Sequence, residues 1–73
     1  MSIKFRWGIS PGEGEPYDMW HFPAAVAKAE REARDRPGET VRLKDNDTGI
    51  LLAIWRADGT HNVYRRCWPA KWA

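Results

Sequence analysis

The clearest hydrophobic pattern in the chain spans residues 50–68. A run of apolar residues precedes the pair Asp58-Gly59, and a second run, in which apolar and polar residues alternate, follows it. Two such runs on either side of Asp-Gly predict a β-hairpin, because this pair adopts the positive φ angles that a two-residue turn needs. With a turn of this length, Ile54 lies opposite Val63.

Side chains alternate between the two faces of a hairpin, so this register sorts residues 50–68 into two sets. The first set is mostly apolar and is the predicted core face: Ile50, Leu52, Ile54, Val63 and Cys67. The second set is aromatic and basic: Leu51, Ala53, Trp55, Tyr64, Arg66 and Trp68. Cys67 is therefore expected to be buried and unreactive, and Arg65 is expected at the edge of the core face.

Patterns in the first half of the chain predict a strand and then a helix. Apolar residues alternate with basic or small ones at Ile3, Phe5, Trp7 and Ile9. This period of two is typical of a strand with one buried face. Residues 10–16 are rich in Pro and Gly and predict a loop, and residues 17–22 are interpreted as an extended lead-in rather than a strand. The helix should begin at Pro23 and stop at Pro37-Gly38.

The predicted helix carries one apolar stripe at helical spacing. Its members are Phe22, Ala25, Val26, Ala29 and Ala33. Most of these side chains are small, so the helix can lie close to a sheet. The opposite side is charged. Glu30 with Arg34 and Glu32 with Arg36 are spaced to form favourable i,i+4 pairs worth about 0.2–0.5 kcal/mol each.

A further strand is predicted at residues 40–44, with Val41 and Leu43 facing inward, and the polar residues 45–49 predict a turn. The elements combine into a single α+β domain, residues 1–73. One helix packs on a four-stranded, mostly antiparallel sheet in the order β-α-β-β-β.

Composition narrows the class of protein. A chain of 73 residues buries a modest core, and its single cysteine excludes an internal disulfide, so self-association is a plausible further source of stability. Twelve basic against ten acidic residues is a small excess for a nucleic-acid binder, although the basic residues prevail from Arg56 onward. The chain shows no secretion signal and no apolar stretch of about 20 residues, so a cytoplasmic location in a bacterial host is expected.

The candidate site is the aromatic and basic face of the hairpin, extended onto the neighbouring strand. Its members are Arg42, Lys44, Trp55, Tyr64, Arg66 and Trp68. Such a face can anchor a protein partner through Trp, Tyr and Arg side chains. It can also stack bases and hold phosphates. The third interpretation is structural, since the N-terminal strand, the C-terminal tail or a second copy of the chain would cover the same surface.

No pattern in the sequence points to catalysis, to a metal or to a cofactor. His21, His61 and Cys67 lack the paired spacing of a zinc site. The acidic stretch 45–49 resembles a calcium loop only faintly and is better explained as a hairpin turn. Glu13 and Glu15 sit in a Gly- and Pro-containing loop that fixes no carboxylate geometry. We therefore expect a protein that is not an enzyme.

Residues 22–68 resemble a pattern found in small phage and mobile-element proteins. An alanine-rich helix, residues 24–30, is followed by Gly38, a short strand and a hairpin of the form Leu-Leu-Ala-x-Trp-x-x-Asp-Gly, residues 51–59. The combination is similar to the small anti-CRISPR proteins that inhibit type I systems. That resemblance implies binding to a subunit of the CRISPR surveillance complex and blocking of DNA binding or nuclease recruitment by occlusion.

The resemblance assigns no role to any single residue, because the group shares no catalytic motif. Two other classes of function stay open. One is a small single-stranded nucleic-acid-binding domain, whose affinity would fall steeply with salt. The other is a non-catalytic regulatory module that acts as a homodimer.

Overall fold

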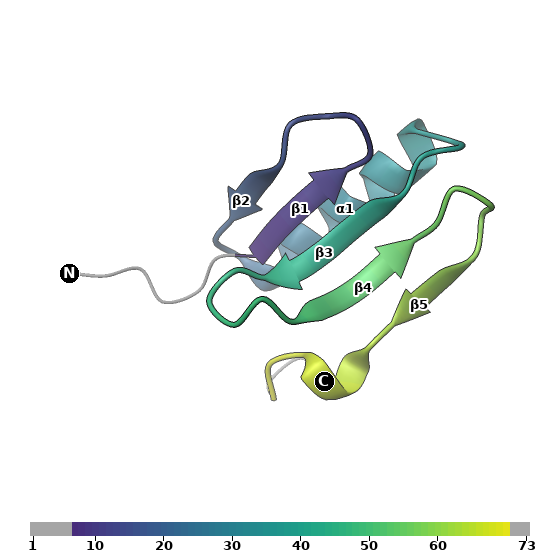
Figure 1. Cartoon of the computed structure of the whole chain (residues 1–73). Helices are drawn as coiled ribbons and strands as arrows, with labels where there is room; N and C mark the ends of the chain where they lie inside the picture. Colours follow the sequence, from purple (N-terminus) through teal and green to yellow (C-terminus); the bar gives the residue numbers. More distant parts are fainter. Residues whose placement is uncertain (1–6, 71–73) are drawn as a thin grey trace.

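The computed structural model describes residues 7–70 and has one helix packed on one face of a five-stranded antiparallel sheet (Figure 1). The strand order is β2-β1-β3-β4-β5. The elements are β1 (Trp7–Pro11), β2 (Tyr17–Met19), α1 (Phe22–Asp35), β3 (Val41–Asp45), β4 (Leu51–Trp55), β5 (His61–Val63) and the 3₁₀ turn η1 (Arg65–Cys67). The predicted α+β class with a single helix is confirmed.

The fifth strand is β2, which the sequence interpretation had taken as an extended lead-in. That interpretation is wrong, because β2 pairs with β1 and places Tyr17 opposite Ile9. The loop before it is held by backbone bonds, in which Gly12 N donates to Thr40 O and Gly14 N donates to Pro11 O. This tight reversal returns the chain alongside β1. Ile3 and Phe5 lie outside the described residues.

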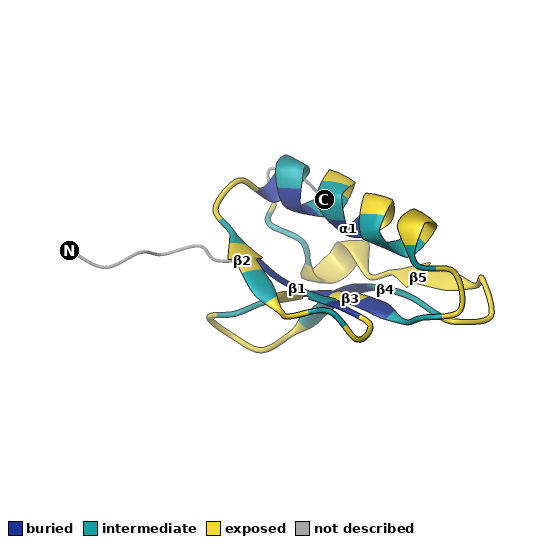
Figure 2. Ribbon diagram, turned by 90° about the horizontal axis from the view of Figure 1, so that it is seen from above, coloured by how far each residue is buried: buried dark blue, intermediate teal, exposed yellow. Residues whose placement is uncertain are grey.

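The helix α1 begins and ends within one residue of its predicted bounds, with a proline in its first turn. The predicted stripe faces the sheet: Phe22, Ala25 and Ala29 are buried, and Val26 and Ala33 pack partly buried against them. Alanine lets the helix approach closely, and α1 lies against β1 and β3. Figure 2 shows α1 above the sheet, on the side of β1 and β3, with β5 and η1 not covered by the helix.

The core lies between α1 and the face of the sheet that we call the inner face. Ile9, Val41 and Leu43 are fully buried there, and Ile9 and Leu43 lie in a cross-strand row with Ala53 of β4. A β-bulge interrupts the pairing of β3 with β4 after Leu43. The bulge inserts Leu52 as an extra residue, which explains why the consecutive residues Leu52 and Ala53 are both buried.

The β4–β5 hairpin has a different register from the predicted one. Arg56 N donates to Thr60 O, and Gly59 N donates to Arg56 O, so the loop has three residues, 57–59, with Gly59 at a φ of +92°. A type I turn followed by a left-handed glycine is a common three-residue hairpin. Ile54 therefore lies opposite Asn62 rather than Val63. This slip of one residue moves every β5 side chain to the other face.

The last predicted strand is also shorter than expected. β5 ends at Val63, and the chain turns through η1 instead of continuing along β4. Cys67 lies in this turn and is exposed, so the prediction of a buried cysteine is wrong. The cause is a contact distant in sequence, since the Trp68 indole packs on Phe22 and draws the chain toward α1. Within residues 7–70, no helix has the length and apolar character needed to cross a membrane.

Candidate functional site

The structure divides the six candidate residues between separate surfaces. Arg42 and Lys44 are exposed on the outer face of the sheet, the face opposite α1, because they alternate with the buried Val41 and Leu43. Trp55 pairs with Val41 and therefore belongs to the inner face. The prediction that Arg42 and Lys44 share a face with Trp55 is wrong, because the bulge at Leu52 breaks the alternation along β4 and turns Ala53 and Trp55 toward the inner face.

The remaining three residues follow β5. Tyr64 and Arg66 are exposed on the segment that leaves the sheet. Trp68 turns the other way and packs against the core cluster, as Trp55 does. The two tryptophans thus lie together on the α1 side of the sheet, whereas Arg42 and Lys44 lie together on the outer face.

That surface is a groove, which we call the α1–β5 groove. It exists because α1 lies over β1, β2 and β3, so that Trp55 of β4 and Val63 of β5 stay partly exposed on the inner side of the sheet. Its volume is about 380 Å³. The lining residues are Phe22, Pro23, Val26, Ala27 and Glu30 from α1, and Trp55, Val63, Arg65 and Trp68 from the hairpin and its extension.

The tryptophan at the end of the groove is held in place by two interactions. Trp68 Nε1 donates a hydrogen bond to Leu52 O at 3.0 Å. Its ring packs edge-to-face against Phe22, with ring centroids 5.0 Å apart, and Phe22 in turn packs on Trp7 at 4.8 Å. Both distances fall in the range of favourable aromatic pairs. An aromatic series therefore links the core to the groove wall.

Arg65 adds a positive charge to this wall. Its guanidinium carbon lies 4.8 Å from the centre of the Trp68 ring, within the range of a cation–π interaction. No carboxylate among residues 7–70 forms an ion pair with Arg65. Its charge is therefore available to a partner that binds in the groove.

A second hollow of about 450 Å³ continues the groove toward the end of α1. Glu30 and Trp55 line both hollows, so Trp55 lies near the middle of one continuous depression. The second hollow is lined by charged residues of both signs, including Arg34 and Asp58. The groove is thus apolar and aromatic at one end and polar at the other.

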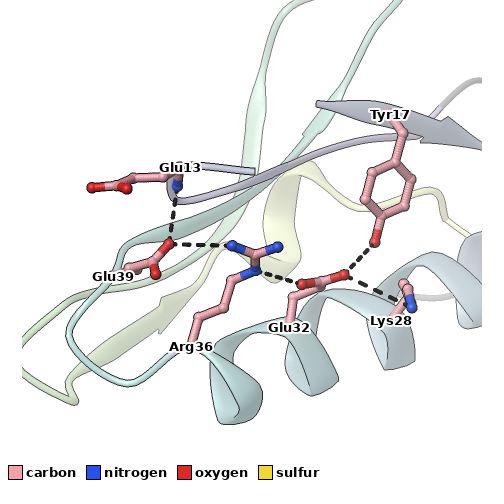
Figure 3. Close-up of polar contacts among 6 residues, drawn as sticks. All are labelled: Glu13, Tyr17, Lys28, Glu32, Arg36 and Glu39. Atoms are coloured by element: carbon pink, nitrogen blue, oxygen red, sulfur yellow. Dashed lines mark hydrogen bonds and ion pairs between the residues drawn. The ribbon is translucent and has the colours of Figure 1, made fainter. Parts of the chain in front are cut away.

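On its other side, α1 is held to the first hairpin by a polar network (Figure 3). Glu32 accepts hydrogen bonds from Arg36 Nε at 2.8 Å and from the Tyr17 hydroxyl at 3.1 Å. Glu39 accepts from Glu13 N at 3.0 Å and contacts Arg36 at 3.4 Å. The predicted pairing of Glu32 with Arg36 is confirmed, whereas the predicted pairing of Glu30 with Arg34 is wrong, since the described residues show no ion pair between them. The network joins α1 to β2 and to the loop before it.

This network is suited to structure rather than to proton transfer near neutral pH. The hydrogen bond from Arg36 holds the pKa of Glu32 below its usual value. Burial, together with the hydrogen bond to Glu32, raises the pKa of Tyr17 to about 12. Glu32 is therefore charged and Tyr17 neutral at pH 7, whereas a general acid or base works best with a pKa near the working pH.

Other groups that could carry chemistry do not gather in the described part of the chain. Across residues 7–70, no three His, Cys, Asp or Glu side chains lie close enough to hold a metal ion. The acidic turn 45–49 is a hairpin turn, as predicted, in which Asp45 accepts from Asp47 N and from Gly49 N.

Of the residues that line the groove, sequence reasoning had assigned only Trp55 and Trp68 to a site, and it missed the others, among them Phe22, Val63 and Arg65. Phe22 and Val63 had been taken for core residues, and Arg65 for a side chain at the edge of the core. The signal was present in part, because Asp-Gly also fits a three-residue loop with glycine last. That loop would have placed Val63 beside Trp55 on one face.

The fold and the groove define a small α+β domain with a preformed aromatic depression between its helix and an edge hairpin. No protein-family model, no curated protein and no solved structure matches the chain.

Proposed function

We propose that this protein is a non-catalytic binding module that attaches to a protein partner through the α1–β5 groove and acts by occlusion. The observation that carries the proposal is the arrangement of Trp55, Trp68 and Arg65 along a depression that α1 leaves open. Trp and Arg are the residue types most enriched at energetic centres of protein interfaces.

The groove also has the rigidity that favours binding. Trp68 is fixed by its bond to Leu52 O and by its contact with Phe22, so little side-chain freedom is lost when a partner docks. Rings that are already ordered supply large contact areas at low entropic cost. A flat, mobile surface of the same composition would bind more weakly.

The resemblance of residues 22–68 to small type I anti-CRISPR proteins supplies the proposed partner. It is a subunit of the crRNA-guided surveillance complex in the cytoplasm of a bacterial host. A domain of 8.5 kDa bound to such a subunit would block DNA binding or recruitment of the nuclease. The groove supports this proposal because occlusion needs a binding surface and no catalytic group.

The test is a plaque assay on a host with an active type I system, combined with capture of the purified surveillance complex. The wild-type protein should restore plaquing. Arg65→Glu should weaken capture about tenfold or more, since loss of an interface anchor costs about 2 kcal/mol. Arg42→Glu is the matched control, because it reverses one exposed charge on the outer face of the sheet and should leave capture unchanged.

A second pair of variants tests the aromatic part of the groove. Trp55→Ala should abolish capture, whereas Trp20→Ala, which alters a side chain that is 58% exposed outside the groove, should not. Circular dichroism confirms that both variants are folded. Full capture by folded Trp55→Ala and Arg65→Glu would reject the groove as the binding surface. Salt-sensitive oligonucleotide binding that Arg42→Glu removes would assign nucleic acid to the outer face instead.

A further inference from the structure

The open side of β5 has the form of a strand-binding edge. β5 is the last strand in the order β2-β1-β3-β4-β5, so within residues 7–70 only β4 pairs with it. Arg56 N donates to Thr60 O, and Tyr64 N donates to Leu52 O. Hydrogen-bonded and non-hydrogen-bonded pairs alternate along antiparallel strands, so Asn62 and Ile54 form the bonded pair between these two. The backbone N–H and C=O groups of His61 and Val63 then point away from β4.

The same two residues present their side chains to the groove side. Val63 pairs with Ala53, and His61 pairs with Trp55, and both of these partners belong to the inner face. A strand added beside β5 would bond to the backbone of His61 and Val63. Its alternate side chains would extend from the inner face next to Val63, which lines the groove and is 37% exposed. Edge and groove thus form one continuous site.

Charge indicates which kind of strand fits this edge. Arg65 and Arg66 follow β5 after one intervening residue, Tyr64, and both are exposed. Neither forms an ion pair within residues 7–70. Glu30 is the carboxylate that lines the apolar part of the groove, but it lies on the opposite wall, on α1. A segment lying along β5 would therefore meet two free cations rather than Glu30.

We propose that the β5 edge binds an extended segment of a partner protein by strand addition, with an apolar side chain in the α1–β5 groove and a carboxylate beside Arg65 and Arg66. The proposal deepens the proposed function, because it rests on the groove being the partner-binding surface. Backbone bonds would supply affinity and the groove would select the side chain, as in other cases of strand addition to an open sheet edge.

The probe is a synthetic peptide of about six residues, the usual length of a strand, with blocked ends. It carries Leu and Val at alternate positions and Glu at both ends. Binding to the ¹⁵N-labelled protein is followed by NMR. We expect the amides of His61 and Val63 and the Trp68 indole N–H to shift, and the two amides to become protected from hydrogen exchange. Replacing the Glu residues with Lys should weaken binding about tenfold.

Two controls separate strand addition from simple insertion of a side chain. A peptide N-methylated at the positions that face β5 keeps its side chains but cannot form the edge bonds, so its binding should be lost. Val63→Pro removes the donor on the open edge without removing a bond to β4, whereas Val63→Ala keeps that donor. Binding should be lost with Val63→Pro and only reduced with Val63→Ala.

Several results would overturn the proposal. They are the absence of any shift at millimolar peptide, equal binding of the N-methylated peptide, or shifts confined to Arg42 and Lys44. A dimer in solution that Val63→Pro dissociates would assign the edge to a second copy of the chain. If groove variants lose capture of the complex but the wild-type protein binds no peptide, strand addition is refuted and the proposed function stands. If the wild-type protein binds the peptide but groove variants still capture the complex, the proposed function is refuted and strand addition stands.

Discussion

Trp68 Nε1 donates a hydrogen bond to the backbone oxygen of Leu52, 16 positions earlier in the chain. The same oxygen accepts a bond from Tyr64 N. The Leu52 carbonyl of β4 thus accepts hydrogen bonds from both ends of the segment 64–68, which contains η1. The path of the chain after β5 depends on this carbonyl and on the contact of Trp68 with Phe22.

Replacing Trp68 with Phe tests this anchor. The aromatic ring stays but the donor is lost, so the free energy of unfolding should fall by about 1 kcal/mol. The cost is moderate because Leu52 O keeps its bond from Tyr64 N. Chemical denaturation measures the change, and Trp20→Phe, at an exposed position, is the control. An unchanged midpoint for Trp68→Phe would show that the indole bond does not stabilise the fold.

Ala29 is fully buried where α1 lies on the sheet. Ala29→Leu should overpack this contact and lower the free energy of unfolding by about 1–3 kcal/mol. Ala27→Leu makes the same change at an exposed position of the helix, and its effect should stay within about 0.5 kcal/mol. Thermal melts compare the melting temperatures of Ala29→Leu and Ala27→Leu, and Ala29→Leu should melt at the lower temperature. Equal melting temperatures would mean that α1 does not pack through this stripe.

The ion pair of Glu32 with Arg36 makes stability depend on pH in the acid range. Because the pKa of Glu32 is lowered in the folded protein, its contribution is present above the unfolded pKa of about 4.3 and disappears as the pH falls through the folded value. Glu32→Gln should therefore cost about 1 kcal/mol at pH 7 and much less near pH 2.

Urea unfolding at several pH values measures this dependence for Glu32. The control is Glu30→Gln, which removes a carboxylate that forms no ion pair within the described chain. A constant difference between wild type and Glu32→Gln from pH 7 to pH 2 would contradict the role assigned to the charged pair.

Gly59 allows the three-residue hairpin loop to form. At a φ of +92°, a Cβ atom meets no atom within 4 Å, so Gly59→Ala adds backbone strain without a steric clash. We expect a loss of about 1 kcal/mol in the free energy of unfolding. Ala57→Gly, in the same loop, controls for general loop flexibility. A neutral Gly59→Ala would indicate a different turn.

The parts of the fold that were predictable from sequence depend on local periodicity. The helix α1 was predicted to within a residue because its apolar stripe and its flanking prolines are local signals. The inward positions of Val41 and Leu43 follow equally from the alternation along β3. Both features are set by neighbours a few positions away in the chain.

The features that were missed depend on contacts distant in sequence. Asp58-Gly59 is compatible with a turn of two or three residues, and the pattern alone does not distinguish them. The bulge at Leu52 and the exit of the chain after Val63 both serve packing against α1, through Phe22 and Trp68. The candidate site inherited both errors, because the bulge exchanges the faces of the β4 residues that follow it and the one-residue slip exchanges the two faces of β5.

The position of α1 over β1, β2 and β3, and not over β5, has a consequence for motion within the domain. β5 is short, lies at the edge, and has no helix above it, so its bonds to β4 should open at a lower free energy than those in the middle of the sheet. Exchange of the Asn62 amide, which lies in the bonded pair with Ile54, should accordingly be faster than exchange of the bonded amides of β3. The strand that opens most easily is the one that lines the groove, so an occupied groove should slow exchange mainly there.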